Sequence, residues 1–291
     1  MNNTILEKLK ELKLNGAAQA YAALLEEPSL SDGLSTDELM LQLLESEANL
    51  RFANRQKCLI RQAAIPLPAM LKDVIYSDER GADLRQNLSQ LATLDFIRNG
   101  QNVTIFGPTA TGKSFLACAI ARKACANGFS TTYIGTKELI EDMKLKVGTA
   151  GYVNKRRSLK GRALLVLDDF SLTLYDNDDQ AILFDVLNDR YGKKSTIIVS
   201  QKTPVVWNQE MNGTTLAQSI VSRASSNNFS LVLKGKSMRS RLRFDSEKDS
   251  LPEDLPDSGS VAESVAGNCN SYRSDDIQTQ LPKHMKEIND E

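Results

Sequence analysis

Histidine is almost absent from this chain of 291 residues. The single one, His284, lies in a polar segment near the C-terminus. A Ser-His-Asp triad needs a histidine base and many metal sites use several imidazoles, so neither has enough material here. If the protein hydrolyses a substrate, it must do so with carboxylates and a bound cation.

Long apolar runs are also missing, and none approaches the roughly 18 residues that cross a bilayer. The N-terminal sequence MNNTILEKLKELKLNG alternates charge with leucine and lacks the apolar core and cleavage site of a secretory signal. The four cysteines include no Cys-x-x-Cys pair, which favours reduced cysteines in the core. We therefore expect a cytoplasmic protein with no membrane partner.

Charge is balanced overall, with 36 basic and 37 acidic residues, but it is unevenly distributed. Residues 244–291 hold 12 acidic and 4 basic side chains, a net of −8, and the remaining chain has a net of +7. We predict a disordered acidic tail, because this segment has too few large apolar residues to offset the entropy of ordering. The basic body suggests a nucleic-acid partner, and an ordinary solvated surface is the alternative.

Residues 3–64 have the apolar periodicity of helices. In ILEKLKELKLNGAAQAYAALLEE, apolar residues recur close to every 3.6 residues. A second helix is predicted to begin at STDE, where Ser35 caps it and Glu38 completes a capping box. It stops before the Ile-Pro-Leu-Pro of residues 65–68. We predict an all-helical N-terminal domain over residues 1–68 and connecting helices over 69–100.

From about residue 100 onward, predicted strands alternate with helices. The helical stretches are KSFLACAIARKACANG, TKELIEDMKLK, DDQAILFDVLNDRYG and TTLAQSIVSRAS. This alternation predicts an α/β domain over residues 101–243, with a parallel sheet covered by helices on both faces. The strands are predicted at 102–106, 130–135, 162–170, 195–200 and 229–233.

The stretch GPTATGKS, residues 107–114, satisfies the pattern G-x-x-x-x-G-K-[ST] in full, and we call it the glycine loop. It follows a predicted strand and opens a predicted helix, which is the context that phosphate-binding loops require. Backbone N–H groups of such a loop surround a phosphate, and the helix N-terminus adds its positive end. We expect Lys113 to neutralise the β- and γ-phosphates of a nucleotide and Ser114 to offer its hydroxyl to Mg²⁺. A glycine loop that binds no nucleotide is the alternative.

The third predicted strand, LLVLDDF, ends in two carboxylates. Asp168 is placed to hold the shell of a Mg²⁺ ion, as a Walker-B acid does, and Asp169 to act on an attacking water as base or orienter. Acids at a strand end are weak evidence alone. After a complete glycine loop they become strong evidence for a nucleotide and magnesium site.

Residues 103–239 resemble the AAA+ ATPases of the DnaC-like helicase-loader group, and most closely the IstB-like insertion-sequence ATP-binding proteins. The matching pieces are FGPTATGKSFLACAIARKACANGFS, ALLVLDDF, STIIVSQKTPVVW, LAQSIVSRAS and LKGKSMR. The helical stretch STDELMLQLLESEANLRFANRQKCLIRQAAIP is similar to the domain that precedes the ATPase in such proteins. The resemblance implies a P-loop AAA+ fold with a five-stranded parallel sheet, preceded by a small all-helical domain.

The resemblance also implies roles at matching positions. Gln201 falls at the polar sensor that contacts the γ-phosphate or the lytic water, and Arg239 where a second sensor lies. Arg223 falls at the arginine finger, which reaches a neighbouring subunit's nucleotide in a homo-oligomer; an ordinary surface arginine is the alternative. The implied ligands are ATP and Mg²⁺, with nucleotide contacts from Gly107, Pro108, Thr109, Ala110, Thr111, Gly112, Lys113, Ser114 and Phe115.

Two positions depart from the family's pattern. Asp169 stands where many AAA+ proteins have glutamate, and its shorter side chain predicts slow hydrolysis. Ala110 stands where a third glycine is frequent in such loops.

Two basic stretches are candidate DNA contacts. Arg51 and Arg55 lie on one helical face, and Lys155, Arg156 and Arg157 lie in a basic segment, 144–162, that we expect to be a loop. A solvated surface is the alternative for both. A third cluster comprises Lys234, Lys236, Arg239, Arg241 and Arg243.

The sequence favours an ATP-regulated transposition helper that assembles on double-stranded DNA and stimulates the transposase of its mobile element. A DnaC-like loader of a replicative helicase is the alternative within the ATPase class. A small-molecule P-loop kinase fits poorly, because no acceptor pocket or arginine-rich lid is visible. A nucleotide-loaded scaffold without useful hydrolysis is the remaining alternative.

Overall fold

A computed structural model describes residues 2–76 and 83–235. The predicted tail, His284 and the cationic residues Lys236, Arg239, Arg241 and Arg243 lie outside the described residues. The chain separates into two compact units, Met1–Cys58 and Leu59–Glu291.

The first unit is helical, as its periodicity predicts. Its elements are α1 (Asn2–Glu11), α2 (Asn15–Glu26), a short 3₁₀ turn (Pro28–Ser31) and most of α3 (Thr36–Gln62). The predicted capping box opens α3: the Ser35 amide donates to Glu38 Oε2 (2.7 Å), and the Glu38 amide donates to Ser35 Oγ (3.3 Å).

One expected helix is divided in two, because Lys13 adopts a left-handed φ of +58° between α1 and α2. The division places the N-terminus of α2 against α3. A Cβ on Gly16 would lie 2.5 Å from the Ser46 carbonyl oxygen, so only glycine permits this approach. The buried Glu47 carboxylate accepts hydrogen bonds from the amides of Gly16 (2.6 Å) and Ala17 (3.2 Å). An acid on α3 therefore caps α2.

The second unit contains the predicted five-stranded sheet, and every strand pairing is parallel. The strand order is β2-β3-β4-β1-β5. The five predicted strands are confirmed, with ends shifted by at most two residues. They are β1 (Asn102–Phe106), β2 (Thr131–Gly135), β3 (Leu164–Asp168), β4 (Ser195–Ser200) and β5 (Asn228–Val232).

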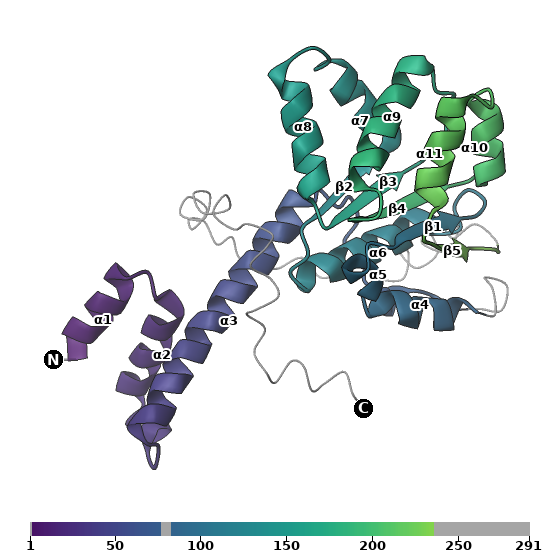
Figure 1. Cartoon of the computed structure of the whole chain (residues 1–291). Helices are drawn as coiled ribbons and strands as arrows, with labels where there is room; N and C mark the ends of the chain where they lie inside the picture. Colours follow the sequence, from purple (N-terminus) through teal and green to yellow (C-terminus); the bar gives the residue numbers. More distant parts are fainter. Residues whose placement is uncertain (1, 77–82, 236–291) are drawn as a thin grey trace, which may run out of the picture. The chain divides into compact units, whose positions relative to one another are not determined.

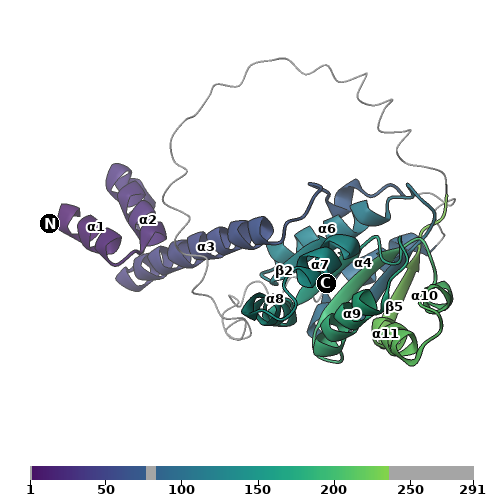
Figure 2. The ribbon, with the colours of Figure 1, turned by 90° about the horizontal axis from the view of Figure 1, so that it is seen from above.

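Helices cover both faces of this sheet (Figures 1 and 2). On one face lie α4 (Leu84–Ala92), α5 (Asp95–Arg98) and α6 (Lys113–Ala126). The other face carries α7 (Thr136–Lys144), α8 (Ala150–Gly161), α9 (Asn177–Arg190), α10 (Pro204–Glu210) and α11 (Thr215–Ser225). In the described part of the chain, no helix has the length and apolar character needed to span a membrane.

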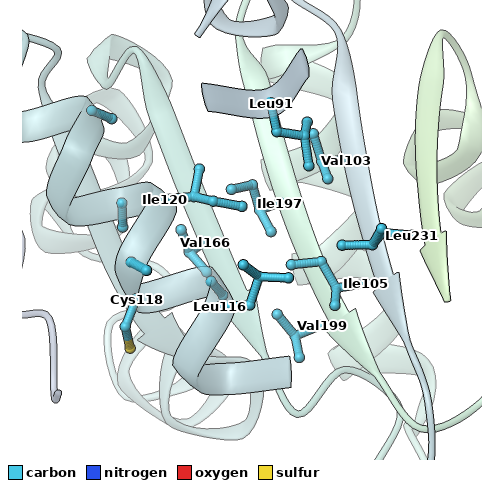
Figure 3. Packing of buried hydrophobic residues seen from close by; sticks show 14 of the residues in the cluster. Leu91, Val103, Ile105, Leu116, Cys118, Ile120, Val166, Ile197, Val199 and Leu231 are labelled. Carbon is cyan, nitrogen blue, oxygen red and sulfur yellow. The ribbon is translucent and has the colours of Figure 1, made fainter. Parts of the chain in front are cut away.

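Alternate residues of the central strands β3 and β4 enter opposite cores. Val166 and Ile197 pack with Leu116 and Ile120 of α6 (Figure 3), whereas Leu165 and its neighbours face α7 and α9. Because both faces of β3 and β4 are buried, these strands contain continuous apolar runs rather than alternating ones. This explains why the run LLVLD is so strongly apolar.

We expected the basic segment 144–162 to be a loop. This prediction is wrong, because most of the segment forms helix α8. The helix begins after Thr149, whose side chain accepts a hydrogen bond from the Gly151 amide (3.2 Å). Leu159 is buried in the core on the α7–α9 side of the sheet. The helix was not predicted because its glycines and many charged residues leave only a narrow apolar stripe.

Candidate functional site

The strand order brings three strand ends together. β4 lies between β1 and β3, so the residues that follow β1, β4 and β3 share one edge of the sheet. These are the glycine loop, Gln201 and the pair Asp168–Asp169. Such an edge, at the carboxyl ends of parallel strands, is where open α/β sheets bind ligands.

The glycine loop connects β1 to α6 with glycines at its two ends. A Cβ on Gly107 would lie 2.2 Å from the Leu233 carbonyl oxygen, so no other residue fits beside the end of β5. Gly112 precedes α6 with a φ of +86°. Both requirements explain the glycine spacing of the motif. The loop ends at the N-terminus of a 14-residue helix, whose first amides suit an anion.

Ala110, which departs from the usual glycine, also adopts a left-handed φ of +63°. An alanine in this region carries a steric cost that glycine avoids. The family's preference for glycine here thus has a backbone reason.

Lys113 lies inside the loop, with 6% of its surface exposed. Its Nζ donates a hydrogen bond to the Pro108 carbonyl oxygen at 2.8 Å. Burial lowers the pKa of Lys113, and the charges of Asp169 and Asp168 act in the opposite direction. The side chain therefore presents an ammonium group at the loop, beside the two acids.

Asp168 ends β3 with hydrogen bonds to both carboxylate oxygens. Its Oδ1 accepts from Ser114 Oγ (3.2 Å) and from the Asp169 amide (2.9 Å). Its Oδ2 accepts from the hydroxyl of Tyr133 on β2. The Thr136 hydroxyl donates to the Asp168 backbone carbonyl at 2.7 Å. Two predicted metal ligands, Ser114 and Asp168, are thus in direct contact.

Tyr133 is a site residue that sequence reasoning missed. β2 pairs with β3 so that Gly135 lies opposite Asp168, and Tyr133 is two residues earlier on the same face. Burial raises the pKa of Tyr133, and the Asp168 carboxylate raises it further, so the hydroxyl stays protonated and donates. The available signal was a lone tyrosine in the strand STTYIG, which is uninformative until the register is known.

Asp169 and Gln201 lie beside the glycine loop. Asp169 adopts a φ of +51°, and the next residue, Phe170, returns to the sheet by donating its amide to the Val199 carbonyl (2.9 Å). The Thr109 hydroxyl donates to Gln201 Oε1 at 2.6 Å. Aspartate tolerates this backbone conformation better than most residues do.

The oxygen donors of the site fit a magnesium ion. Mg²⁺ prefers hydroxyl, carboxylate, phosphate and water oxygens, and adjacent oxygens in its octahedral shell lie about 2.9 Å apart, given Mg–O distances of about 2.0–2.1 Å. Ser114 Oγ and Asp168 Oδ1 lie 3.2 Å apart.

Arg223 lies at the opposite edge of the sheet from the glycine loop. Its backbone carbonyl accepts from Asn102 Nδ2 (3.1 Å), at the start of β1, whereas the loop follows the end of β1. Its Nε donates to Asn188 Oδ1 (2.8 Å), and its guanidinium lies 4.5 Å from the centroid of the Phe184 ring. Arg223 therefore does not meet the site of its own chain.

Most of the candidate DNA contacts are engaged with acids of the same chain. Lys155 pairs with Asp142 (2.9 Å), and Arg156 pairs with Asp185 (2.7 Å) and also with Asp189. In the first unit, Arg51 pairs with Glu47 at 2.6 Å. Arg157 is exposed on α8, and Arg55 is half-buried on α3.

Known proteins share both the sequence and the fold. The pattern of the IstB-like ATP binding protein family matches residues 7–246. The insertion sequence ATP-binding protein y4uH of Sinorhizobium fredii is 34% identical over 247 residues, covering 85% of this chain and 98% of that one. The IS1162 ATP-binding protein of Pseudomonas fluorescens is 34% identical over 203 residues, covering 69% and 87%.

Two solved structures share the fold at low identity. DnaI aligns with a TM-score of 0.51 and 17% identity, covering 62% of this chain and 94% of that one. The replication initiator DnaA, bound to AMPPCP and single-stranded DNA, aligns with a TM-score of 0.50 and 20% identity, covering 64% and 56%.

Proposed function

Because the chain belongs to the IstB-like ATP-binding proteins of insertion sequences, we propose that it is an ATP-dependent assembly factor for transposition. In this proposal it assembles on double-stranded DNA while ATP is bound, and it stimulates or targets the transposase of the same element. The observation that carries the proposal is the contact of Ser114 with Asp168 beside a complete glycine loop.

The glycine loop and the first turn of α6, residues 107–115, bind the triphosphate in this proposal. Backbone amides of the loop surround the β-phosphate, and Lys113 exchanges the Pro108 carbonyl for phosphate oxygens. Ser114 and Asp168 would hold Mg²⁺, which when bound withdraws charge from the β- and γ-phosphates.

Hydrolysis uses the residues beside the loop. Asp169 orients the attacking water or accepts its proton, and Gln201 contacts the γ-phosphate or that water. Both side chains belong to the strand-end group that includes the loop. The short side chain of Asp169 makes turnover slow, so ATP times the lifetime of the assembly.

Arg223 completes the site of a neighbouring copy in this proposal. Its position at the far edge of the sheet supports a role between subunits, because it cannot reach the loop of its own chain. A trans arginine accelerates phosphoryl transfer by about 10³–10⁵ in GTPases. The chain is then incomplete as a monomer and forms nucleotide-bridged homo-oligomers.

DNA binding in this proposal uses cationic side chains of α3 and α8. Of the five predicted contacts, the exposed Arg157 is best placed to meet a phosphate backbone, because Lys155, Arg156 and Arg51 already have acidic partners. A DnaC-like helicase loader is the second candidate, because the sequence resemblance includes that group.

ATP turnover measured alone, with duplex DNA, with single-stranded DNA and with the element's transposase separates the candidates. Stimulation by duplex DNA and transposase supports the proposal, and stimulation by single-stranded DNA with a helicase supports the loader. Phosphate transfer to a metabolite supports a kinase. The absence of turnover under every condition supports a nucleotide-loaded scaffold. Lys113→Ala is the control, because loss of the ammonium group should abolish nucleotide binding and assembly on DNA.

A further inference from the structure

We propose that Tyr133 is a positioning residue that fixes the Asp168 carboxylate for metal binding. The proposal rests on the proposed function, in which Asp168 and Ser114 hold Mg²⁺ beside the nucleotide. It adds a residue on the neighbouring strand that does not touch metal or nucleotide itself.

The hydrogen bonds of Asp168 divide its two oxygens between two tasks. Oδ1 faces Ser114 Oγ, the second candidate metal ligand, and also accepts from the Asp169 amide. Oδ2 is directed to the other side, where the Tyr133 hydroxyl donates to it. The terminal torsion of an aspartate is broad and roughly twofold, so a carboxylate without such a partner samples several orientations. Tyr133 selects the orientation in which Oδ1 meets Ser114.

The surroundings of Tyr133 hold its hydroxyl in place. Only 6% of its surface is exposed, and its ring packs in the core between the sheet and α6. The pairing of β2 with β3 fixes its height relative to Asp168, with Tyr133 opposite Val166 and Gly135 opposite Asp168. Partners of metal ligands commonly alter metal affinity by about 10–100-fold when they are removed.

The test is nucleotide binding by Tyr133→Phe as Mg²⁺ is varied. Phenylalanine keeps the ring in the core and removes only the hydroxyl. A fluorescent ATP analogue is titrated into the full chain in EDTA and then at increasing Mg²⁺. We expect the Mg²⁺ concentration at half-effect to rise by about 10-fold or more. The affinity for the nucleotide in EDTA should stay within about twofold, because the glycine loop is unchanged.

Tyr152→Phe is the matched control. The Tyr152 hydroxyl donates to the carboxylate of Asp185 at 3.0 Å, so this variant also breaks a tyrosine–aspartate hydrogen bond, between α8 and α9 rather than at the glycine loop. It should leave the Mg²⁺ dependence unchanged. Circular dichroism confirms that both variants fold.

The outcomes distinguish a failure of the positioning role of Tyr133 from a failure of the proposed function. If the unmodified chain binds no nucleotide or shows no Mg²⁺ effect, the proposed function fails and Tyr133 loses its role. If the unmodified chain responds to Mg²⁺ and Tyr133→Phe responds identically, only the positioning role is overturned. An equal loss of affinity with and without Mg²⁺ in Tyr133→Phe also overturns it, because that result describes general damage to the loop.

Discussion

Replacing Ala110 with glycine should stabilise the protein, against the usual effect of adding a glycine. Ala110 has a left-handed φ of +63°, where an L-residue suffers a clash of roughly 1–2 kcal/mol. Glycine removes that clash but adds roughly 0.4–1 kcal/mol of entropy to the unfolded chain. The net expectation is a gain of about 0.5–1 kcal/mol in the free energy of unfolding.

Thermal unfolding measures this gain. A change of 1 kcal/mol shifts the melting temperature by about 2–4 °C in domains of 150–250 residues, so Ala110→Gly should raise it by about 1–4 °C. The reciprocal control is Gly128→Ala, because Gly128 has a φ of +83° and a Cβ added there would meet nothing within 4 Å. That variant should lose a similar amount from the backbone alone. A fall in the melting temperature of Ala110→Gly, with Gly128→Ala behaving as expected, would refute the backbone reasoning.

Three further predictions concern the active assembly and the first unit. Asp169→Asn should bind ATP but hydrolyse it slowly, so size-exclusion chromatography should find an ATP-bound assembly that persists. Arg223→Ala should be inactive alone yet recover some turnover when mixed with Lys113→Ala, because each variant supplies what the other lacks; absence of recovery in verified mixed oligomers contradicts a trans role. Glu47→Ala should lower the free energy of unfolding by about 1–3 kcal/mol, because two helix amides lose their acceptor, whereas the exposed Glu45→Ala should change it little.

The centre of the sheet could be predicted from the sequence because β3 and β4 are buried on both faces. A run such as LLVLD is unambiguous when glycine, proline or charge bounds it, and the glycine loop fixes where β1 ends and α6 begins. Gly112 is required by local backbone geometry, and Gly107 by the approach of β5, but both belong to one short motif that a local pattern reveals. Asp168 is detected for the same reason, as the first charge after an apolar strand.

The features that sequence reasoning missed depend on contacts between distant segments. The break at Lys13 is stabilised by Glu47, 34 positions along the chain, and periodicity alone cannot report that acceptor. Arg156 looked available to DNA because its partners Asp185 and Asp189 lie on another helix. Tyr133 acquires its role only through the register of β2 on β3.

Arg223 and the glycine loop lie at opposite edges of the sheet. A row of subunits in which Arg223 of one copy contacts the glycine loop of the next is therefore directional. One copy contributes the edge where its strands begin and the next contributes the edge where its strands end, so the joined surfaces differ. Such head-to-tail contacts close into a ring if the rotation between neighbours permits and otherwise extend as an open helix. The two ends of an open helix then differ. At one end the nucleotide site receives no arginine from a neighbouring subunit, and at the other end Arg223 has no neighbouring nucleotide site to complete. Growth and loss of subunits can therefore proceed at different rates at the two ends.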